Sequence, residues 1–354
     1  MFRSSGLRFG ARPDTRHAVL LGALVLLAAV GCTDATAPTS AVLAPQANAF
    51  PSGPSTKISY GSKSLAEYQA KWSNPFGLLE LSAGGTLNVA ANGDVKVRAV
   101  PFQVGSDFGV YDHLKYLAVS NQSFPVPAVG SLTISARIQA STPGTQAGRV
   151  VRGCYGGPFS YQNVSDACAQ PWSAVALEGQ QAGVVLNMIN FQTGQLFDWF
   201  VSENQVFALI ERLPGNVTGA PNVGLDKAYT QIIKVANITP GKKYDVAIRY
   251  TRGPGVSRVE FFLDHVLFSS IDNVGVPLDK QGILFTGIHP SYGAGEVLSL
   301  DSFVIGHGLF SLLDAFPYQH PDRPDLSVSI PMSERLFGQG ANGTFSDFEV
   351  STRP

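Results

Sequence analysis

Three carboxylic acids in the middle of the chain are the residues whose types are best suited to chemistry. Glu178 and Glu211 lie near the ends of two segments that the sequence predicts to be inner strands, and Asp198 lies on a third. If a curved sheet holds such carboxyl groups about 5–10 Å apart, they can form the acid pair of a glycoside hydrolase. Glu211 can also form a strand-end ion pair with Arg212. Glu178 and Glu211 are therefore weak catalytic candidates.

A second polar cluster suggests a different reaction. It consists of Asp112, His113, Lys115 and Tyr116. The histidine and the tyrosine have the right types for the base and acid of a polysaccharide lyase, and the lysine can neutralise a uronate. A solvated strand edge explains the same residues without any chemistry, and this is the interpretation that we favour.

Aromatic and amide side chains provide candidate contacts to a sugar. The flat face of a tyrosine or tryptophan matches the apolar face of a pyranose ring, although core packing is the commoner role of tryptophan. Two of the tyrosines belong to a loop that contains glycine and proline, which favours a ligand-facing position. The candidate ligand-binding residues are Tyr155, Tyr161, Trp172, Asn187, Asn190, Trp199, Glu211 and Arg212.

Cysteines and histidines limit the covalent and metal chemistry. Cys154 and Cys168 can form a disulfide, which for a loop of about 15 residues contributes about 3 kcal/mol in the chain-entropy model. Two free thiols are the alternative. The histidines show no metal-ligand spacing, and we expect no cofactor. The sequence also allows a structural calcium ion at Asp322 and Asp325, although two carboxylates are fewer than the roughly six to eight oxygen ligands that calcium takes.

Composition excludes some classes of partner and favours strands. The chain has 354 residues and a formal net charge of -1, which argues against nucleic acid as a partner. Only 14% of the residues are charged, and there are 37 glycines and 23 prolines. This composition is typical of strands and turns and differs from that of a helical or disordered chain.

Alternating hydrophobicity predicts the elements that position these residues. Segments 131–139, 245–251 and 258–264 alternate apolar and polar side chains, which indicates half-buried strands. Asn92-Gly93 joins two further strands as a hairpin, because both residue types tolerate positive φ. We expect more strands at 174–178, 183–191, 196–202, 205–212, 228–235, 282–287, 299–305 and 344–351, and a short helix at 64–71. About a dozen strands without a βαβ rhythm predict an all-β, two-sheet sandwich.

The N-terminus resembles a bacterial lipoprotein signal. Four arginines precede an apolar run at 18–30, and the run ends in Ala29-Val30-Gly31-Cys32. Its length of about 13 residues is short of the roughly 20 that a spanning helix needs. The resemblance implies cleavage after Gly31 and acylation of Cys32, for example with palmitate, so that the membrane is a partner through lipid. It also implies export to the cell envelope, with Thr33 compatible with the outer membrane. An ordinary cleaved signal is the alternative.

These patterns divide the chain into three parts. Residues 1–31 form the expected signal peptide, and residues 32–60 form a flexible tether rich in Ala, Pro, Thr and Ser. Residues 61–354 form the sandwich, since no linker interrupts the strands.

Several strand patterns resemble the concanavalin A-like lectin/glucanase superfamily. One is the hairpin at 258–268, where His265 replaces the usual glycine of an Asp-Gly turn, and another is the closing strand at 343–350. Segments 211–214 and 337–341 also resemble an uncharacterised bacterial family of this fold. The resemblance implies a jelly roll whose concave sheet faces ligand. The paired Glu-x-Asp-x-Glu carboxylates of the superfamily's glucanases are missing from the sequence, so the resemblance does not imply hydrolysis.

Three functions are compatible with these observations. We expect an envelope lipoprotein that binds carbohydrate, such as a polysaccharide, on its concave sheet. One alternative is a glycoside hydrolase or polysaccharide lyase with a non-standard acid pair. The other is a structural or partner-binding surface protein, which a concave face filled by side chains would favour.

Overall fold

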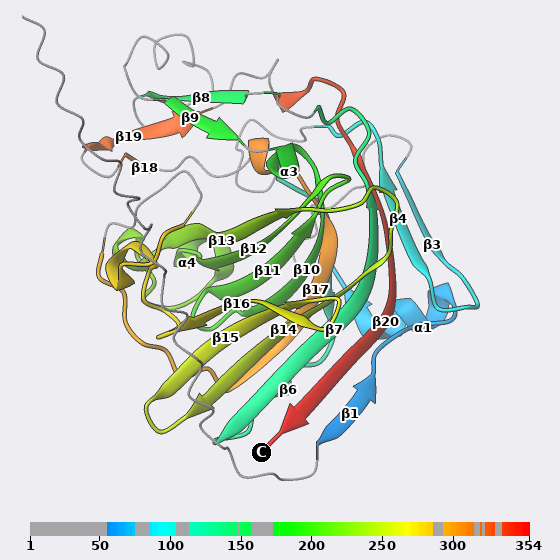
Figure 1. Ribbon diagram of the computed structural model, residues 1–354, viewed down its shortest axis with the longest axis horizontal. Helices are drawn as coiled ribbons and strands as arrows, with labels where there is room; N and C mark the ends of the chain where they lie inside the picture. Colours follow the sequence, from blue (N-terminus) through cyan, green and yellow to red (C-terminus); the bar gives the residue numbers. More distant parts are fainter. Residues whose placement is uncertain are drawn as a thin grey trace, which may run out of the picture. The chain divides into compact units, whose positions relative to one another are not determined.

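Two antiparallel β-sheets dominate the computed structural model of the chain (Figure 1). It describes residues 55–74, 85–103, 113–146, 149, 151–156, 173–176, 178–285, 293–314, 319–320, 323–329 and 335–354. All of these belong to one compact unit, Ala49–Pro354. The prediction of an all-β sandwich is confirmed. The expected signal peptide and Cys32 lie outside the described residues.

Sheet A contains the long strands that the alternating segments predict. The neighbour order is β16-β15-β14-β7-β20-β4-β3, with β1 also paired to β20. Their bounds are β16 (Val266–Asp272), β15 (Val256–Leu263), β14 (Tyr244–Gly253), β7 (Gly130–Ser141), β20 (Ala341–Arg353), β4 (Val95–Ala99), β3 (Thr86–Val89) and β1 (Thr56–Ser59).

Sheet B contains the strands with most of the candidate site residues. The neighbour order is β13-β12-β11-β10-β17-β5-β2, and β6 pairs with β17. Their bounds are β13 (Tyr229–Asn237), β12 (Gln205–Arg212), β11 (Gln195–Val201), β10 (Gly183–Asn190), β17 (Ser302–Phe310), β5 (Leu114–Ser120), β2 (Trp72–Ser73) and β6 (Phe124–Pro125).

A smaller third sheet and short helices complete the described fold. The third sheet has the order β18-β19-β8-β9, from β18 (Gln319–His320), β19 (Arg323–Ser329), β8 (Val151–Gly156) and β9 (Ser173–Ala176). The α-helices are α1 (Leu65–Lys71), α3 (Glu178–Gln181) and α4 (Gly215–Thr218), and 3-10 turns cover 225–227, 279–281 and 312–314. Within the described ranges, no helix has the length and apolar character to cross a membrane.

The hydrophobic core lies between sheets A and B. Strand β7 alternates almost perfectly, with Leu132, Ile134 and Ile138 buried. They belong to the same core cluster as Phe197 and Trp199 of sheet B. Because successive side chains on a strand point to opposite faces, sheet B has one face toward this core. We call its other face the outer face.

A buried polar contact fixes α1 to the core. The Tyr68 hydroxyl lies 2.8 Å from the Tyr116 hydroxyl and 2.8 Å from Nε2 of His307. Trp72 packs edge-on against the His307 ring, with centroids 4.7 Å apart. The helix itself begins as predicted, since the Ser64 hydroxyl accepts a hydrogen bond from the Glu67 N–H. Burial lowers the pKa of His307 to about 3, so its ring is neutral.

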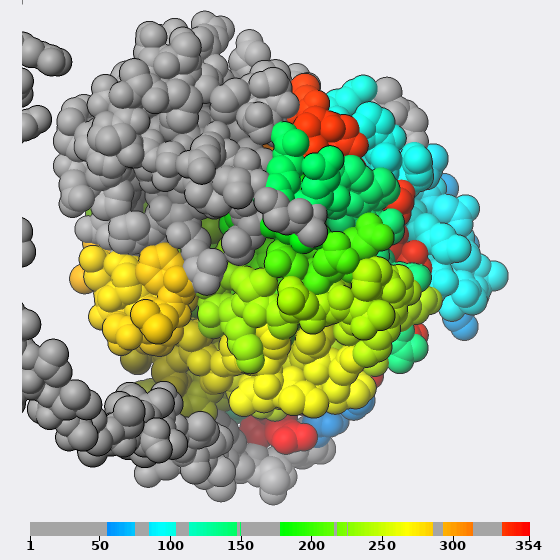
Figure 2. Space-filling model, turned by 45° about the horizontal axis from the view of Figure 1, so that its top comes forward, coloured from blue at the N-terminus to red at the C-terminus, as the bar shows by residue number. Residues whose placement is uncertain are grey.

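The two sheets meet along one side at β13 and β16. Figure 2 shows the yellow-green and yellow part of the chain, which includes β13 to β16, packed side by side across one face. Nζ of Lys234 on β13 donates a hydrogen bond to the carbonyl of Phe268 on β16. This contact closes the sandwich next to the strands of the candidate site.

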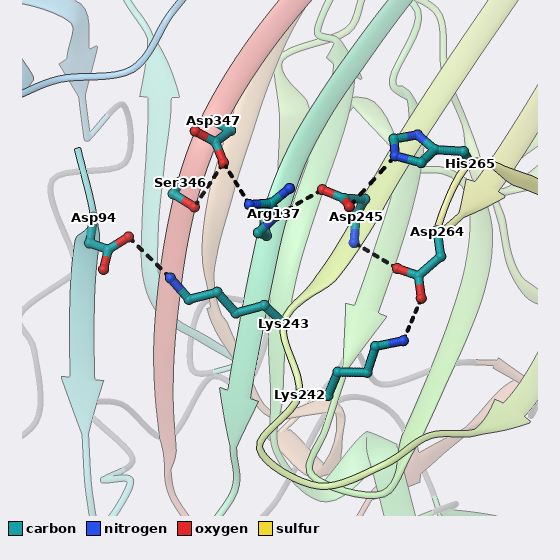
Figure 3. A network of polar contacts seen from close by, with 9 residues as sticks. All are labelled: Asp94, Arg137, Lys242, Lys243, Asp245, Asp264, His265, Ser346 and Asp347. Atoms are coloured by element: carbon teal, nitrogen blue, oxygen red, sulfur yellow. Dashed lines mark hydrogen bonds and ion pairs between the residues drawn. The ribbon is translucent and has the colours of Figure 1, made fainter. Parts of the chain in front are cut away.

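Charged side chains cover the solvent face of sheet A (Figure 3). Arg137 pairs with Asp245 at 3.0 Å and with Asp347 at 3.4 Å. Lys242 pairs with Asp264 at 2.6 Å. We call this cluster the sheet A network; it also includes Asp94, Lys243, His265 and Ser346. Each of its carboxylates lies beside a basic side chain.

Some sequence-based boundaries are wrong. Residues 56–59, expected in the tether, form β1, because they can pair with the second half of β20 where β4 does not reach. The segment expected as a strand at 174–178 divides into β9 and α3. Residues 282–285 are not a strand, although the sequence predicts one at 282–287. The Asp264-His265 turn is confirmed, with positive φ at both residues.

Candidate functional site on the outer face of sheet B

The outer face of sheet B is mostly apolar. Side chains from six strands form one buried cluster there, with Phe200 and Phe207 stacked at a centroid distance of 4.8 Å. Gly306 and Gly308 of β17 add no side chain to this face. The cluster consists of Leu117, Val119, Val185, Phe200, Phe207, Leu209, Ile232 and Phe310.

A line of four polar side chains crosses this apolar face. Asn187 of β10 and Asp198 of β11 are direct register partners. Glu211 of β12 pairs with Leu196, two residues before Asp198, and Thr230 of β13 pairs with Glu211. Because side chains two residues apart share a face, all four lie on the outer face. We call this line the polar row.

Hydrogen bonds hold each end of the row. Nδ2 of Asn187 donates to Oδ1 of Asp198 at 2.5 Å, and the Thr230 hydroxyl donates to Oε2 of Glu211 at 2.9 Å. Between them, Asp198 and Glu211 are diagonal neighbours on adjacent strands, and Oδ2 of Asp198 is buried without a hydrogen-bond partner. Two acids that are this close and this buried favour a proton on one of them.

The surroundings of the pair explain why it retains that proton. Burial raises the pKa of Asp198 well above its ordinary value, and the charge of Glu211 raises it further. Burial also raises the pKa of Glu211 to about 7, against the opposing effect of the Thr230 hydrogen bond. Asp198 is thus the acid that holds the proton, and Glu211 is the one that ionises near neutral pH.

Exposure changes along the row. Asn187 and Asp198 are each 1% exposed, whereas Glu211 and Thr230 are half-buried. The row is thus closed at β10 and partly open at β12 and β13. A ligand from solvent would meet Glu211 and Thr230 first, with Asp198 behind them.

Trp199 lies on the opposite face from the row. It is fully buried between the sheets, its ring packs on Phe261 and Phe268, and its indole N–H donates to the Ala247 carbonyl at 2.9 Å. Asp198 and Trp199 are consecutive, so one strand cannot present both to one groove. We therefore assign Trp199 to the core.

Asn190 and Arg212 hold the turn between β10 and β11. Oδ1 of Asn190 accepts hydrogen bonds from the backbone and the hydroxyl of Thr193. Nε of Arg212 donates to the Thr193 carbonyl, and its Nη2 pairs with Glu296 at 2.9 Å. The expected ion pair between Glu211 and Arg212 is therefore replaced by one with Glu296.

Glu178 lies at the other end of β12 from Glu211. Its Oε1 accepts a hydrogen bond from Asn204, the residue before β12 begins, whereas Glu211 lies near the end of that strand. Seven strand residues span roughly 23 Å. The structure does not bring these two candidates together, and Glu211 has Asp198 as its carboxyl neighbour instead.

The cluster around His113 is not a solvated strand edge. Strand β5 lies between β17 and β2, and His113 and Lys115 are both buried. Tyr116 points into the core toward Tyr68, and Nζ of Lys115 donates to the Gln103 carbonyl. Asp112 lies outside the described residues. The strand-edge interpretation fails because His113 and Lys115 are buried, although β2 pairs with β5 only at Val119 and Ser120.

Several candidate ligand-binding, disulfide and calcium-binding residues lie wholly or partly outside the described residues. Tyr161, Cys168, Trp172 and Asp322 lie outside the described residues, and the side chains of Cys154, Tyr155 and Asp325 are not described. The disulfide and the calcium site therefore stay predictions. In the ranges that the structure describes, no three His, Cys, Asp or Glu side chains are grouped as metal ligands.

Thr230 is the member of the row that the sequence analysis missed. Its hydroxyl is positioned by the pairing of β13 with β12. The sequence around Thr230 gives no local signal that its hydroxyl binds a carboxylate. The carboxylate, Glu211, is 19 residues away in the chain. Asp198 was recognised as a carboxylate, but its pairing with Glu211 depends on register.

Comparison with known families identifies the chain. The profile of a family of unknown function, DUF6081, matches residues 64–354. The chain belongs to this family. No curated protein matches it.

Solved structures with a similar fold include enzymes and lectins. An endo-1,3-beta-glucanase from Streptomyces sioyaensis is 11% identical with a TM-score of 0.42, covering 86% of this chain and 99% of that one. The beta-agarase B from Zobellia galactanivorans is 11% identical with a TM-score of 0.41, covering 85% and 95%. A basic winged bean lectin with Tn-antigen is 9% identical with a TM-score of 0.32, covering 84% and 98%. Similarity this low says nothing about the ligand of this chain.

Proposed function

We propose that this DUF6081 protein binds carbohydrate on the outer face of sheet B, at the partly open end of the polar row. The observation that carries the proposal is the neighbouring pair of acids Asp198 and Glu211, held on an otherwise apolar face by Asn187 and Thr230. Buried polar groups cost stability, and perturbed acids concentrate at functional sites.

Each residue of the row has a distinct role in this proposal. Glu211 accepts hydrogen bonds from sugar hydroxyls, and the Thr230 hydroxyl contributes a second polar contact beside it. Asp198 and Asn187 are positioning residues, because they are buried behind Glu211 and are hydrogen-bonded to each other. The apolar side chains around the row exclude water, which strengthens these contacts.

The geometry of the pair supports binding over glycoside hydrolysis. Retaining and inverting glycosidases hold their carboxyl groups about 5–5.5 Å or 6.5–9.5 Å apart, to leave room for the sugar or a water. Asp198 and Glu211 are diagonal neighbours on β11 and β12, and Asp198 is buried behind Glu211. A sugar at the open end of the row therefore meets Glu211 without a second acid on its other side.

A protein partner is the second candidate for this face. The observation that favours it is the cluster around Phe200 and Phe207, which fills the outer face with buried apolar side chains. These side chains are at most 6% exposed, so the face is filled by side chains, as is expected of a structural or partner-binding surface protein.

Glycan arrays followed by calorimetry test the proposal. The wild type should bind at least one neutral glycan, and Glu211→Gln and Thr230→Val should each weaken it by about tenfold, the effect of losing one hydrogen bond to a charged or polar group. Glu349→Gln on the solvent face of sheet A is the matched control and should bind like wild type. If no glycan binds, or if the control loses as much affinity as Glu211→Gln, the proposal is wrong.

We also propose that the protein is anchored to the bacterial envelope by lipid on Cys32. The supporting observation is the basic and apolar N-terminus that ends in Val30-Gly31-Cys32. Mass spectrometry of the N-terminal peptide should find an acylated cysteine, and Cys32→Ala should release the protein from the membrane fraction. A mature chain without acyl groups would contradict the anchor but not the binding site.

A further inference from the structure

The charge around the polar row has a consequence for the kind of glycan it accepts. At the partly open end, the ligand meets Glu211, which is negative once it ionises. The neighbouring groups are neutral, since Asn187 contributes an amide, Thr230 a hydroxyl and Gly306 no side chain. No charge in the described part of β10, β13 or β17 on this face compensates Glu211.

The nearest basic residues are occupied elsewhere. Arg212 follows Glu211 but points to the opposite face, where it pairs with Glu296. Lys115 is on β5, at the far side of β17, and its Nζ donates to the Gln103 carbonyl. Tyr229 lies beside Arg212 on the opposite face, and its hydroxyl donates to Gln195. Among described residues, the carboxyl pair therefore sets the charge of the row.

Unsatisfied acceptors at the closed end of the row are a second observation. Asn187 is 1% exposed and its Oδ1, beside Gly306, has no hydrogen-bond partner, and neither has Oδ2 of Asp198. These oxygens lie behind Glu211 and do not contact the ligand. Because no donor offsets their partial negative charge, they disfavour a carboxylate or a sulfate near Glu211.

We infer that the polar row selects uncharged glycans and rejects uronic and sulfated ones. The inference rests on the proposed carbohydrate binding and adds the class of ligand. An anionic sugar would bring a second negative charge next to Glu211 in a region of low dielectric, with no cation in the described part of the row to neutralise it. A neutral sugar needs only to donate hydroxyl protons to the pair.

The rejection should depend on pH, because the pair gains its charge within an accessible range. Below neutral pH the pair holds two protons and is uncharged. Above it, Glu211 ionises while Asp198 keeps its proton, so the row becomes negative. A uronate has a carboxylic pKa of about 3.5, so the anionic glycan stays charged over this pH range. Only the charge of the row changes, and the preference for the neutral glycan therefore rises with pH.

Calorimetry with two oligosaccharides of equal length, one neutral and one of uronates, tests the inference on the full-length protein. We expect the neutral one to bind at least tenfold more tightly at pH 8.5, and the ratio to fall several-fold at pH 5.5. Glu211→Gln should remove the pH dependence of that ratio, whereas Glu349→Gln should keep it. Circular dichroism establishes that each variant is folded.

The outcomes separate the inference from the function on which it rests. If both oligosaccharides bind equally, or the uronate binds better at pH 8.5, the selectivity is wrong and carbohydrate binding stands. If the ratio is independent of pH in the wild type, the pair is not its cause and the inference fails. If neither oligosaccharide nor any glycan on the array binds, the proposed function fails and the inference fails with it.

Discussion

The two carboxylate clusters of this molecule differ in how their charge is balanced. In the sheet A network, the aspartates lie beside Arg137, Lys242 and Lys243. Burial of Asp264 acts to raise its pKa, but the Lys242 hydrogen bond, the Asp245 backbone N–H and nearby positive charge together lower it. On the outer face of sheet B, Asp198 and Glu211 have no basic partner among the described residues, and burial raises the pKa of both. The first cluster is balanced by bases and the second by a proton.

The comparison separates a cluster that needs no functional explanation from one that does. Exposed ion pairs contribute roughly 0–1 kcal/mol each, and many can be removed without measurable effect. A buried acid pair works against folding at neutral pH, so its presence calls for another explanation. Ligand binding at the partly open end of the polar row provides that explanation.

The largest pH effect is expected from His307, which lies between the two sheets. Its folded-state pKa of about 3 lies below its ordinary 6.5, so the folded protein favours the neutral ring and loses stability as pH falls below 6.5. Between pH 7 and pH 4 the loss should be about 3 kcal/mol. Urea unfolding of wild type and His307→Phe at several pH values measures it as the difference between the two profiles. Parallel profiles would mean that the ring is not held neutral.

The carboxyl pair should make the free energy of unfolding depend on pH with the opposite sign, so that stability falls as pH rises. The pKa of Glu211 is raised to about 7, so its contribution to stability is greatest below its unfolded value of about 4.5 and is lost as pH rises toward 7. Relative to the single variant Glu211→Gln, which retains Asp198, the wild type should lose on the order of 2–3 kcal/mol between pH 5 and pH 8. The same urea titration measures it. A difference that stays constant over this range would show that the pair holds no extra proton.

The smallest effect is expected in the sheet A network. Arg137→Gln removes contacts to Asp245 and Asp347 at side chains that are 32–66% exposed, and should cost about 0.5 kcal/mol at low salt and less in 1 M NaCl. Thermal unfolding at both salt concentrations measures the change. A cost of several kcal/mol that persists in high salt would mean that this network, and not the buried pair, is the strongly coupled cluster.

Much of the fold could be predicted from the sequence, because its signals are local. Alternation along 131–139 and 258–264 predicts β7 and β15, and Asn92-Gly93 predicts the turn between β3 and β4. The short helix expected at 64–71 corresponds to α1. The strand at 56–59 was missed because its pairing with β20 connects residues almost 300 positions apart in the chain, as Lys57 and Glu349 show.

The candidate site could be predicted only in part, because it depends on register. Asn187 and Glu211 were both expected at the ligand, and both lie in the polar row. Trp199 and Asp198 are neighbours in sequence, and only the assignment of faces separates the core residue from the row. The proximity of Asp198 and Glu211 follows from the pairing of β11 with β12, which no local pattern encodes.

Carbon-13 NMR of the side-chain carboxyl groups tests most directly whether the acid pair keeps a proton at neutral pH. The two resonances can be assigned with Asp198→Asn and Glu211→Gln. The account predicts that Glu211 titrates with a midpoint near pH 7, while Asp198 keeps the chemical shift of a protonated acid through neutral pH. Two resonances that both titrate near pH 4, as ordinary exposed acids do, would contradict it.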